Sequence, residues 1–272
     1  MPFAAVNGVR LAYEDAGSGD PLILVHGSWT NRRSWDRVAP PLSKRFRVVR
    51  HDRRGHSESE KAPGTLDDDA ADIVALAEHL ELPPFHLACS SRGGVIGLKV
   101  AAARPEVVRS IACHEPPLLG VLSSDGDESD LVDPLIIGEG YVVEMIERGD
   151  HEAAARIFVD RVTFGPGAWD RFPRFMKQTF VENAETFAEE YRDSGVYEAD
   201  FDALRRFPGP ALLTTSDNSP AWFAVVLDRL AEVLPRVERH VYQGAGHNPQ
   251  GMAAEEYLRV VGGFVGRAAQ GH

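Results

Sequence analysis

A serine in a sharp turn between a strand and a helix is the first candidate for chemistry in this chain. Residues 89–94 (CSSRGG) follow the apolar run 85–88 and precede an apolar helical pattern. This arrangement approximates the G-x-S-x-G pattern, in which a strained turn exposes a serine hydroxyl at the N-terminus of a helix. Free N–H groups and the helix dipole favour developing negative charge there. We therefore predict that Ser91 is a nucleophile, although Cys89 stands where the pattern usually has its first glycine.

A serine nucleophile needs a base that takes its proton, and His247 is the candidate. It lies in the glycine-rich segment 243–249 (QGAGHNP), directly after the last predicted strand. A loop histidine taken alone, among 10 in the chain, is most simply a solvent-exposed side chain. Its place after the final strand, at the same sheet edge as Ser91, favours a catalytic base.

Two carboxylates compete for the third role, which is to orient the histidine. Glu115 follows the strand next to the nucleophile strand, and Asp217 follows the strand at 209–214. A carboxylate at the end of an apolar run is costly unless it has a partner, which favours Glu115. Asp217 has an alternative structural role, because it could cap a helix that begins near Ser219. We favour Glu115 and keep Asp217 as the alternative acid.

Backbone N–H groups are expected to stabilise the oxyanion of the reaction. In a strand–turn–helix arrangement of this kind, called a nucleophile elbow, the expected donors are the N–H groups of Arg92, directly after the nucleophile, and Ser28, just after His26-Gly27. The side chain of Arg92 lies beside the cavity, or pairs with a carboxylate of a lid, or is that of a surface arginine with only a backbone role.

Alternating strand and helix patterns must position these residues. Apolar runs predict strands at 21–25, 46–50, 85–90, 108–113, 209–214 and 238–243. Helical patterns lie between them, at 34–44, 65–82, 92–103, 222–234 and 253–267. Repeated strand–helix units of this length predict an α/β fold with a parallel sheet and helices on both faces.

Residues 116–207 interrupt the alternation. They carry a polar loop at 123–127 and helical patterns at 141–147, 151–162 and 172–191. We interpret this piece as a helical lid inserted in a core domain formed by residues 1–115 and 208–272. Its aromatic residues could serve only the packing of the lid, but its underside should also line a cavity. The candidate pocket residues are Trp29, Phe172, Phe175, Met176 and Phe180.

Composition limits the classes of partner. The net charge of −12 argues against nucleic acid and anionic membranes as partners. No apolar stretch is long enough to span a membrane, and the first residues lack the features of a signal peptide. With only Cys89 and Cys113, both expected as buried thiols, a cytoplasmic location is the default expectation. The expected partner is a small-molecule substrate, and a homodimer is left open.

With these residues assembled, the chain resembles α/β-hydrolase-fold proteins over nearly its whole length. The matching segments are 24–27 (LVHG), 52–56 (DRRGH), the elbow at Ser91, and 244–247 (GAGH). The resemblance implies a mostly parallel eight-stranded sheet, a helical lid, a serine–histidine–acid triad, and neither metal nor cofactor. An acid in the position of Glu115 is a known variant, found in some haloalkane dehalogenases and in lactonases that open the macrolide zearalenone. Segments 89–91 and 112–115 look similar to those lactonases, and a serine nucleophile disfavours halide displacement.

Two classes of function follow. The favoured one is a serine hydrolase, an esterase or lactonase that cleaves a hydrophobic small molecule through an acyl-enzyme. The alternative is a non-hydrolytic protein of the same fold, such as a small-molecule receptor, or a lyase or cyclase in a biosynthetic pathway. An intact triad favours hydrolysis.

Overall fold

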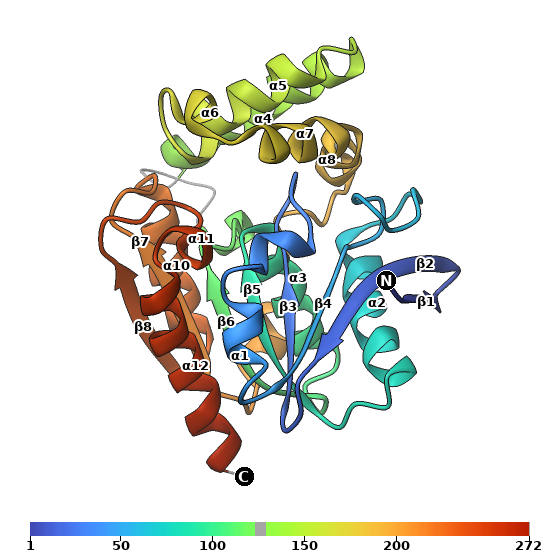
Figure 1. The fold of residues 1–272 in the computed structure, drawn as a ribbon. Coiled ribbons are helices and arrows are strands. Elements are labelled where there is room, and N and C mark those ends of the chain that lie inside the picture. The colour runs from blue at the N-terminus through green and yellow to red at the C-terminus, as the bar shows by residue number, and fades with distance from the viewer. Residues whose placement is uncertain (123–128, 272) are drawn as a thin grey trace.

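An eight-stranded sheet forms the centre of the computed structural model, which describes residues 1–122 and 129–271 (Figure 1). The polar loop expected at 123–127 lies outside the described residues. The strand order is β1-β2-β4-β3-β5-β6-β7-β8; β2 pairs antiparallel with β1 and β4, and the other neighbours are parallel. The predicted mostly parallel eight-stranded sheet is confirmed. The strands are β1 (Phe3–Val6), β2 (Val9–Ala16), β3 (Pro21–Val25), β4 (Arg47–His51), β5 (Phe85–Ser90), β6 (Val108–His114), β7 (Ala211–Ser216) and β8 (Val237–Tyr242).

The inner strands are apolar at consecutive positions because both sheet faces are covered. In β3, Ile23 and Val25 pack into one core cluster, while Leu22 and Leu24 pack into a second one on the other face. All four side chains are fully buried. Side chains alternate across a strand, so a strand buried on both faces needs an unbroken apolar run.

Helices cover both faces as expected. Residues of α2, α3 and α10 belong to the first cluster, and those of α1 and α12 to the second. The helix predicted at 34–44 is instead two short pieces, because Pro40 and Pro41 lack the N–H groups of a helix interior and are tolerated only in a first turn. These elements are η1 (Arg32–Trp35), α1 (Ala39–Leu42), α2 (Leu66–His79), α3 (Arg92–Ala103), α10 (Trp222–Val233), α11 (Pro249–Met252) and α12 (Ala254–Gln270).

A layer of helices between β6 and β7 lies over the carboxyl ends of the parallel strands (Figure 1). We call α4–α8 the upper layer. The helix expected at 172–191 is broken at Asn183, whose side chain bonds to loops of the sheet domain. The elements of this stretch are η2 (Leu119–Val121), α4 (Ser129–Glu147), α5 (His151–Ile157), the π-helical turn η4 (Phe158–Thr163), α6 (Ala168–Arg171), α7 (Arg174–Glu182), α8 (Ala184–Arg192) and α9 (Phe201–Leu204).

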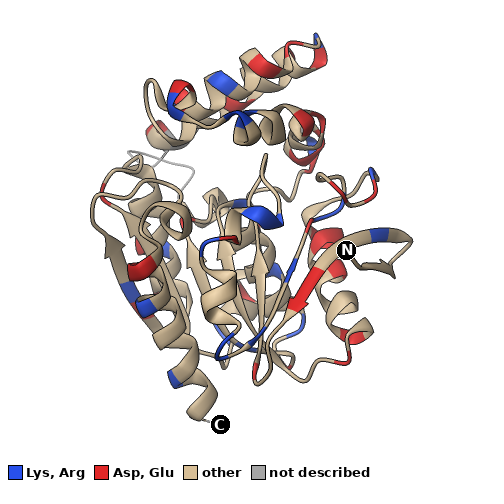
Figure 2. Ribbon diagram, in the orientation of Figure 1, with Lys and Arg blue, Asp and Glu red and all other residues tan. Residues whose placement is uncertain are grey.

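Charged residues occur on both the sheet domain and the upper layer, with acidic and basic positions interspersed (Figure 2). Within the described part of the chain, none of the helices has the length and apolar character needed to cross a bilayer.

Candidate active site

Ser91 lies in a strained turn between β5 and α3. Its backbone has φ 54° and ψ −128°, a conformation that non-glycine residues rarely adopt. Two glycines make this turn possible. A Cβ on Gly27 would lie 2.9 Å from the Ser91 Cβ, and one on Gly93 would lie 2.5 Å from the carbonyl oxygen of Val25. The turn therefore packs tightly against β3 and leaves Ser91 lining a cavity.

Cys89, at the unusual first position of the pattern, is accommodated by the helix behind it. Its side chain is buried, and a Cβ on Gly97 of α3 would lie only 2.6 Å from the Cys89 sulfur. The bulk added by the cysteine is thus offset by the missing side chain of Gly97. Cys113 is its neighbour in the sheet, and both are free buried thiols, as predicted.

Glu115 meets His247 directly. The His247 Nδ1 lies 2.5 Å from the Glu115 Oε2, although the two residues are 132 positions apart in the chain. Glu115 has φ 45°, so the chain turns sharply at the end of β6. The carboxylate is fully buried, and His247 is 6% exposed.

Hydroxyl and amide donors surround the Glu115 carboxylate. Its Oε1 accepts hydrogen bonds from the Thr215 hydroxyl at 2.7 Å and the Ser216 N–H at 2.8 Å. Its Oε2 accepts one from the Ser219 hydroxyl at 2.9 Å. These donors stabilise the ionised form of a carboxylate that has no access to water.

The ionisation of this carboxylate also depends on a second histidine. The His114 Nε2 lies 3.2 Å from the Glu115 Oε2, outside hydrogen-bond alignment. Burial raises the pKa of Glu115, but His114 and His247 outweigh the burial and hold the pKa well below its usual range. Burial lowers the pKa of His114, so this imidazole is neutral near pH 7.

Asp217, the alternative acid, points elsewhere. Its Oδ1 accepts the N–H of Gly244 at 2.8 Å, in the loop that carries His247. It does not cap the following helix, which begins at Trp222 rather than near Ser219. The structure brings Glu115, and not Asp217, to the imidazole.

The other ring nitrogen of His247 is available for chemistry. Within the described part of the chain, its Nε2 is buried and has no hydrogen-bond partner. The ring stacks on Phe223, with centroids 4.7 Å apart, which fixes its plane. His247 and Ser91 line the same cavity.

The two expected oxyanion donors flank Ser91. Arg92 is the first residue of α3, so its N–H has no partner within the helix. The N–H of Ser28 donates to no described residue, and Ser28 lines the cavity.

The Arg92 side chain turns away from the cavity. It is 2% exposed; its Nη2 lies 3.6 Å from Glu139 of α4, and its Nη1 donates to the Val196 carbonyl at 3.2 Å. Burial lowers the pKa of Arg92, but Glu139 outweighs it and the pKa lies above its ordinary value. Of the alternatives that the sequence leaves open, pairing with a carboxylate of the helical insertion is the one observed.

The cavity has a volume of about 1000 Å³ and an asymmetric lining. The upper layer contributes the aromatic side chains together with several polar ones, such as Arg171 and Glu182, and the sheet domain contributes mainly polar ones. Four of the five expected pocket residues line it: Phe172, Phe175, Met176 and Phe180.

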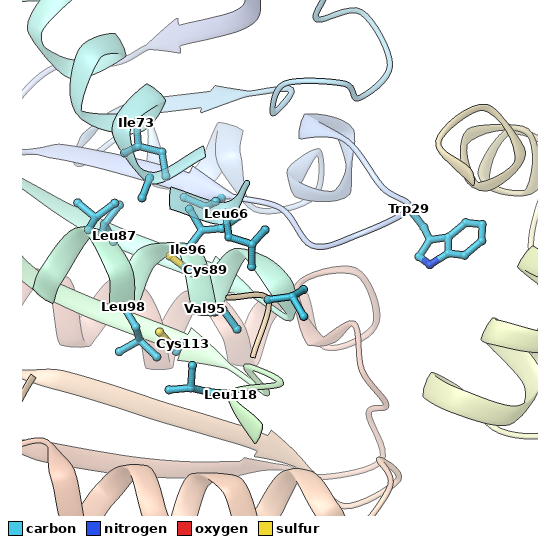
Figure 3. Packing of buried hydrophobic residues seen from close by; sticks show 14 of the residues in the cluster. Trp29, Leu66, Ile73, Leu87, Cys89, Val95, Ile96, Leu98, Cys113 and Leu118 are labelled. Carbon is cyan, nitrogen blue, oxygen red and sulfur yellow. The ribbon is translucent and has the colours of Figure 1, made fainter. Parts of the chain in front are cut away.

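Trp29 does not line this cavity, against the sequence-based expectation. Its side chain is fully buried and stacks on Phe187, with further contacts to Phe158 and Phe180. Figure 3 shows it apart from the core residues of the sheet and close to the helices of the upper layer. The indole fills the junction between loop and helices, so it packs instead of facing a ligand.

One trio among the described residues has the composition of a metal site: His114, Glu115 and His247. The donors already on Glu115 occupy the lone pairs that a metal would need. This set of contacts suits a carboxylate that orients an imidazole rather than one that binds a cation.

Several contributing residues give little signal in the sequence. The donors Thr215 and Ser219 come at and after the end of β7, where small polar residues are ordinary. Their role could be inferred only from the pairing of β6 with β7. Glu190 of α8 reaches Ser28 from a distant helix, and nothing in its local sequence indicates this.

The profile described as "Alpha/beta hydrolase family" matches residues 22–260. A non-heme chloroperoxidase of Streptomyces lividans is 28% identical over 260 residues, which cover 89% of this chain and 90% of the relative. The dihydrolipoyllysine-residue acetyltransferase component of the acetoin cleaving system of Pseudomonas putida is 38% identical over 113 residues, 40% of this chain and 30% of the relative. The uncharacterized hydrolase YraK of Bacillus subtilis is 36% identical over 124 residues, which cover 43% of this chain and 45% of the relative. The chain thus aligns with less than half the length of the latter two.

Solved structures share the fold. An esterase from Thermogutta terrifontis has a TM-score of 0.78 at 21% identity and covers 98% of both chains. An enol-lactonase from Burkholderia xenovorans has a TM-score of 0.78 at 22% identity, covering 97% and 99%. Est816, described as an N-acyl homoserine lactone degrading enzyme, has a TM-score of 0.79 at 21% identity, and the match covers 97% of this chain and 100% of Est816. At such identities the likeness concerns the fold alone.

Proposed function

This chain belongs to the alpha/beta hydrolase family, and from that premise we propose that it is a serine hydrolase of carboxylic esters or lactones. The observation that supports this most is the meeting of three groups at one cavity. Glu115 contacts the Nδ1 of His247 at 2.5 Å. The Nε2 of the same ring has no hydrogen-bond partner among the described residues, and His247 lines the cavity together with Ser91.

In this proposal Ser91 attacks the carbonyl carbon as His247 takes the hydroxyl proton on Nε2. The carbonyl oxygen becomes an oxyanion that accepts the N–H groups of Ser28 and Arg92. His247 then protonates the leaving alkoxide and the acyl-enzyme forms. Water, deprotonated by the same nitrogen, releases the acid and regenerates the serine. Glu115 stabilises the imidazolium formed at each step.

The lining of the cavity supports a hydrophobic substrate of moderate size. A volume of about 1000 Å³ is large for a small-molecule site, whose usual range is roughly 300–1000 Å³. We propose that helices 116–207 act as a lid whose aromatic side chains contact the acyl or lactone ring. The names of the esterase and lactonase neighbours are compatible with this, and a zearalenone-type macrolide is one candidate substrate.

The test is covalent labelling with a fluorophosphonate together with turnover of p-nitrophenyl esters. We expect Ser91→Ala to abolish both. Ser90→Ala is the matched control, because Ser90 is the adjacent serine and also lines the cavity. Labelling that survives in Ser91→Ala and disappears in Ser90→Ala would reassign the nucleophile.

One comparison favours retaining a non-hydrolytic alternative. The relative aligned over 89% of this chain carries the name of a chloroperoxidase rather than a hydrolase. A pre-steady-state burst of p-nitrophenol from activated esters supports the hydrolase. Tight binding of those esters without a burst supports the alternative.

A further inference from the structure

Two buried arginines of the sheet domain each pair with a carboxylate of the upper layer. Arg92 lies beside Glu139 of α4, and Arg53 bonds to Glu190 of α8. All four side chains are at most 5% exposed. Of the two carboxylates, Glu190 is the one whose side chain also contacts the loop that would supply an oxyanion donor.

Glu190 divides its two oxygens between two parts of the sheet domain. Its Oε2 accepts the Ser28 hydroxyl at 2.5 Å, and its Oε1 accepts the Nη2 of Arg53. The Nη1 of Arg53 donates to Asp69 of α2 at 3.1 Å, which holds the guanidinium in place. Ser28 is thus fixed through its side chain, while its N–H donates to none of the residues that the structure describes and Ser28 lines the cavity.

Arg53 and Asn183 also hold the other residues of the loop that carries Ser28. The Nε2 of His26 accepts the N–H of Arg53 at 3.0 Å, and its Nδ1 donates to the Gly27 carbonyl at 2.8 Å. The amide of Asn183, at the start of α8, donates to the Thr30 carbonyl at 3.0 Å. Arg53 therefore holds the loop by its backbone and holds Glu190 by its side chain.

The loop needs such support because its backbone is strained. Trp29, directly after Ser28, has φ 65°, a left-handed conformation that is unfavourable for a bulky residue. Strain of this kind persists only where the surrounding contacts determine it. Loss of one of these contacts should let the Ser28 peptide rotate away from the cavity.

We propose that Glu190 is a positioning residue for the oxyanion site, acting through the Ser28 hydroxyl. This inference rests on the proposed hydrolytic function. It makes α8 part of the catalytic apparatus of the sheet domain, although none of the described cavity-lining residues belongs to α8.

The experiment compares Glu190→Gln with Glu139→Gln in steady-state hydrolysis of p-nitrophenyl butyrate. The amide keeps the volume of Glu190 but cannot accept from both Ser28 and Arg53. Removing an oxyanion donor costs roughly 10²–10³ in kcat, and displacing one should cost less, about 10- to 100-fold. We expect that loss in kcat for Glu190→Gln with KM within twofold. Glu139→Gln, the equivalent change at the other arginine, should keep kcat within twofold.

A double-mutant cycle separates positioning from general loss of structure. If Glu190 acts through the Ser28 hydroxyl, Ser28→Ala and Ser28→Ala/Glu190→Gln have the same kcat. Additive losses, or an unchanged kcat in Glu190→Gln, overturn the inference. Should Glu190→Gln fail to fold, Ser28→Ala alone decides: a kcat within twofold of the parent refutes the proposal. Fluorophosphonate labelling of the parent protein at Ser91 shows separately whether the hydrolytic function itself holds.

Discussion

Two buried carboxylate centres lie near the candidate nucleophile, and they are stabilised in opposite ways. At the first, Glu115 stands alone among neutral donors and two imidazoles. At the second, Asp69 and Glu190 share the guanidinium of Arg53. The pKa of Glu115 lies well below its usual range, whereas burial raises the pKa of Asp69 to about 7, despite the opposing effect of Arg53.

The difference lies in what faces each carboxylate: His114 and His247 outweigh the effect of burial on the pKa of Glu115, whereas Arg53 does not outweigh it for Asp69, which lies beside Glu190. Four hydrogen-bond contacts converge on the two oxygens of Glu115. At the second centre one guanidinium, that of Arg53, is divided between Asp69 and Glu190. The first centre suits a group that must remain an anion while it orients a histidine. The second suits a group that connects helices to a loop.

The largest expected effect tests the assignment of the first centre. Glu115→Gln should lower kcat by roughly 10³- to 10⁴-fold, because the neutral amide neither fixes the imidazole tautomer nor stabilises the imidazolium. Steady-state hydrolysis of p-nitrophenyl butyrate provides the measurement.

Asp217→Asn is the matched control. The amide oxygen can still accept the Gly244 N–H, so kcat should remain within a few-fold of the parent. A loss of several orders of magnitude in this variant, with Glu115→Gln active, would move the acid to Asp217 and remove the contrast between the two centres.

The second centre should make folding stability depend on pH. The folded pKa of Asp69, about 7, exceeds the unfolded value of about 3.9, so the folded state binds more protons between these values. The contribution of Asp69 to the free energy of unfolding therefore falls as pH rises from about 4 to 7, by on the order of 2–4 kcal/mol. Asp69→Asn should flatten this slope in urea titrations at pH 4.5, 6 and 7.5. An unchanged slope would mean that Asp69 is ionised throughout.

The first centre should act with the opposite sign and in a lower window. The folded pKa of Glu115 lies below the unfolded value of about 4.3, so its contribution is present above that pH and is lost as pH falls further. The free energy of unfolding of the parent should therefore fall more steeply with decreasing pH than that of Glu115→Gln, so that the advantage of the parent shrinks as the medium becomes more acidic. Urea titrations followed by circular dichroism between pH 5 and 2.5 measure both slopes; equal slopes would contradict the lowered pKa.

The sequence accounts for the parts of this picture that depend on local pattern. The alternation of apolar runs with helical patterns predicts the sheet, and the positions of Ser91 and His247 at strand ends predict that they share an edge. The choice between Glu115 and Asp217 stays open at that level, because both follow adjacent parallel strands. It is decided by the contact of Glu115 with His247, made at a turn where Glu115 has φ 45°, and no sequence pattern encodes that turn.

Sequence patterns also fail to predict the pairing of Glu190 with Ser28 and the position of Trp29, but the cause is different. Ser28 and Glu190 are 162 positions apart, and they meet only because a helix of the insertion packs onto the loop after β3. The same packing buries Trp29 against Phe187. Contacts of this kind depend on how the upper layer docks, and hydrophobic periodicity contains no information about docking.

The smallest expected effect tests whether a single hydrogen-bond donor to Glu115 contributes measurably to kcat. Ser219→Ala removes one hydrogen bond to the Oε2 of Glu115, and a hydrogen bond contributes about 1 kcal/mol net, so kcat should fall about fivefold. Ser219→Thr keeps the hydroxyl and should restore most of that loss. If both variants match the parent in kcat, the three remaining contacts are enough to hold the carboxylate. The low pKa of Glu115, in contrast to that of Asp69, then depends on His114 and His247. If Ser219→Ala instead approaches the loss of Glu115→Gln, the hydroxyl has a role in catalysis beyond stabilising the anion.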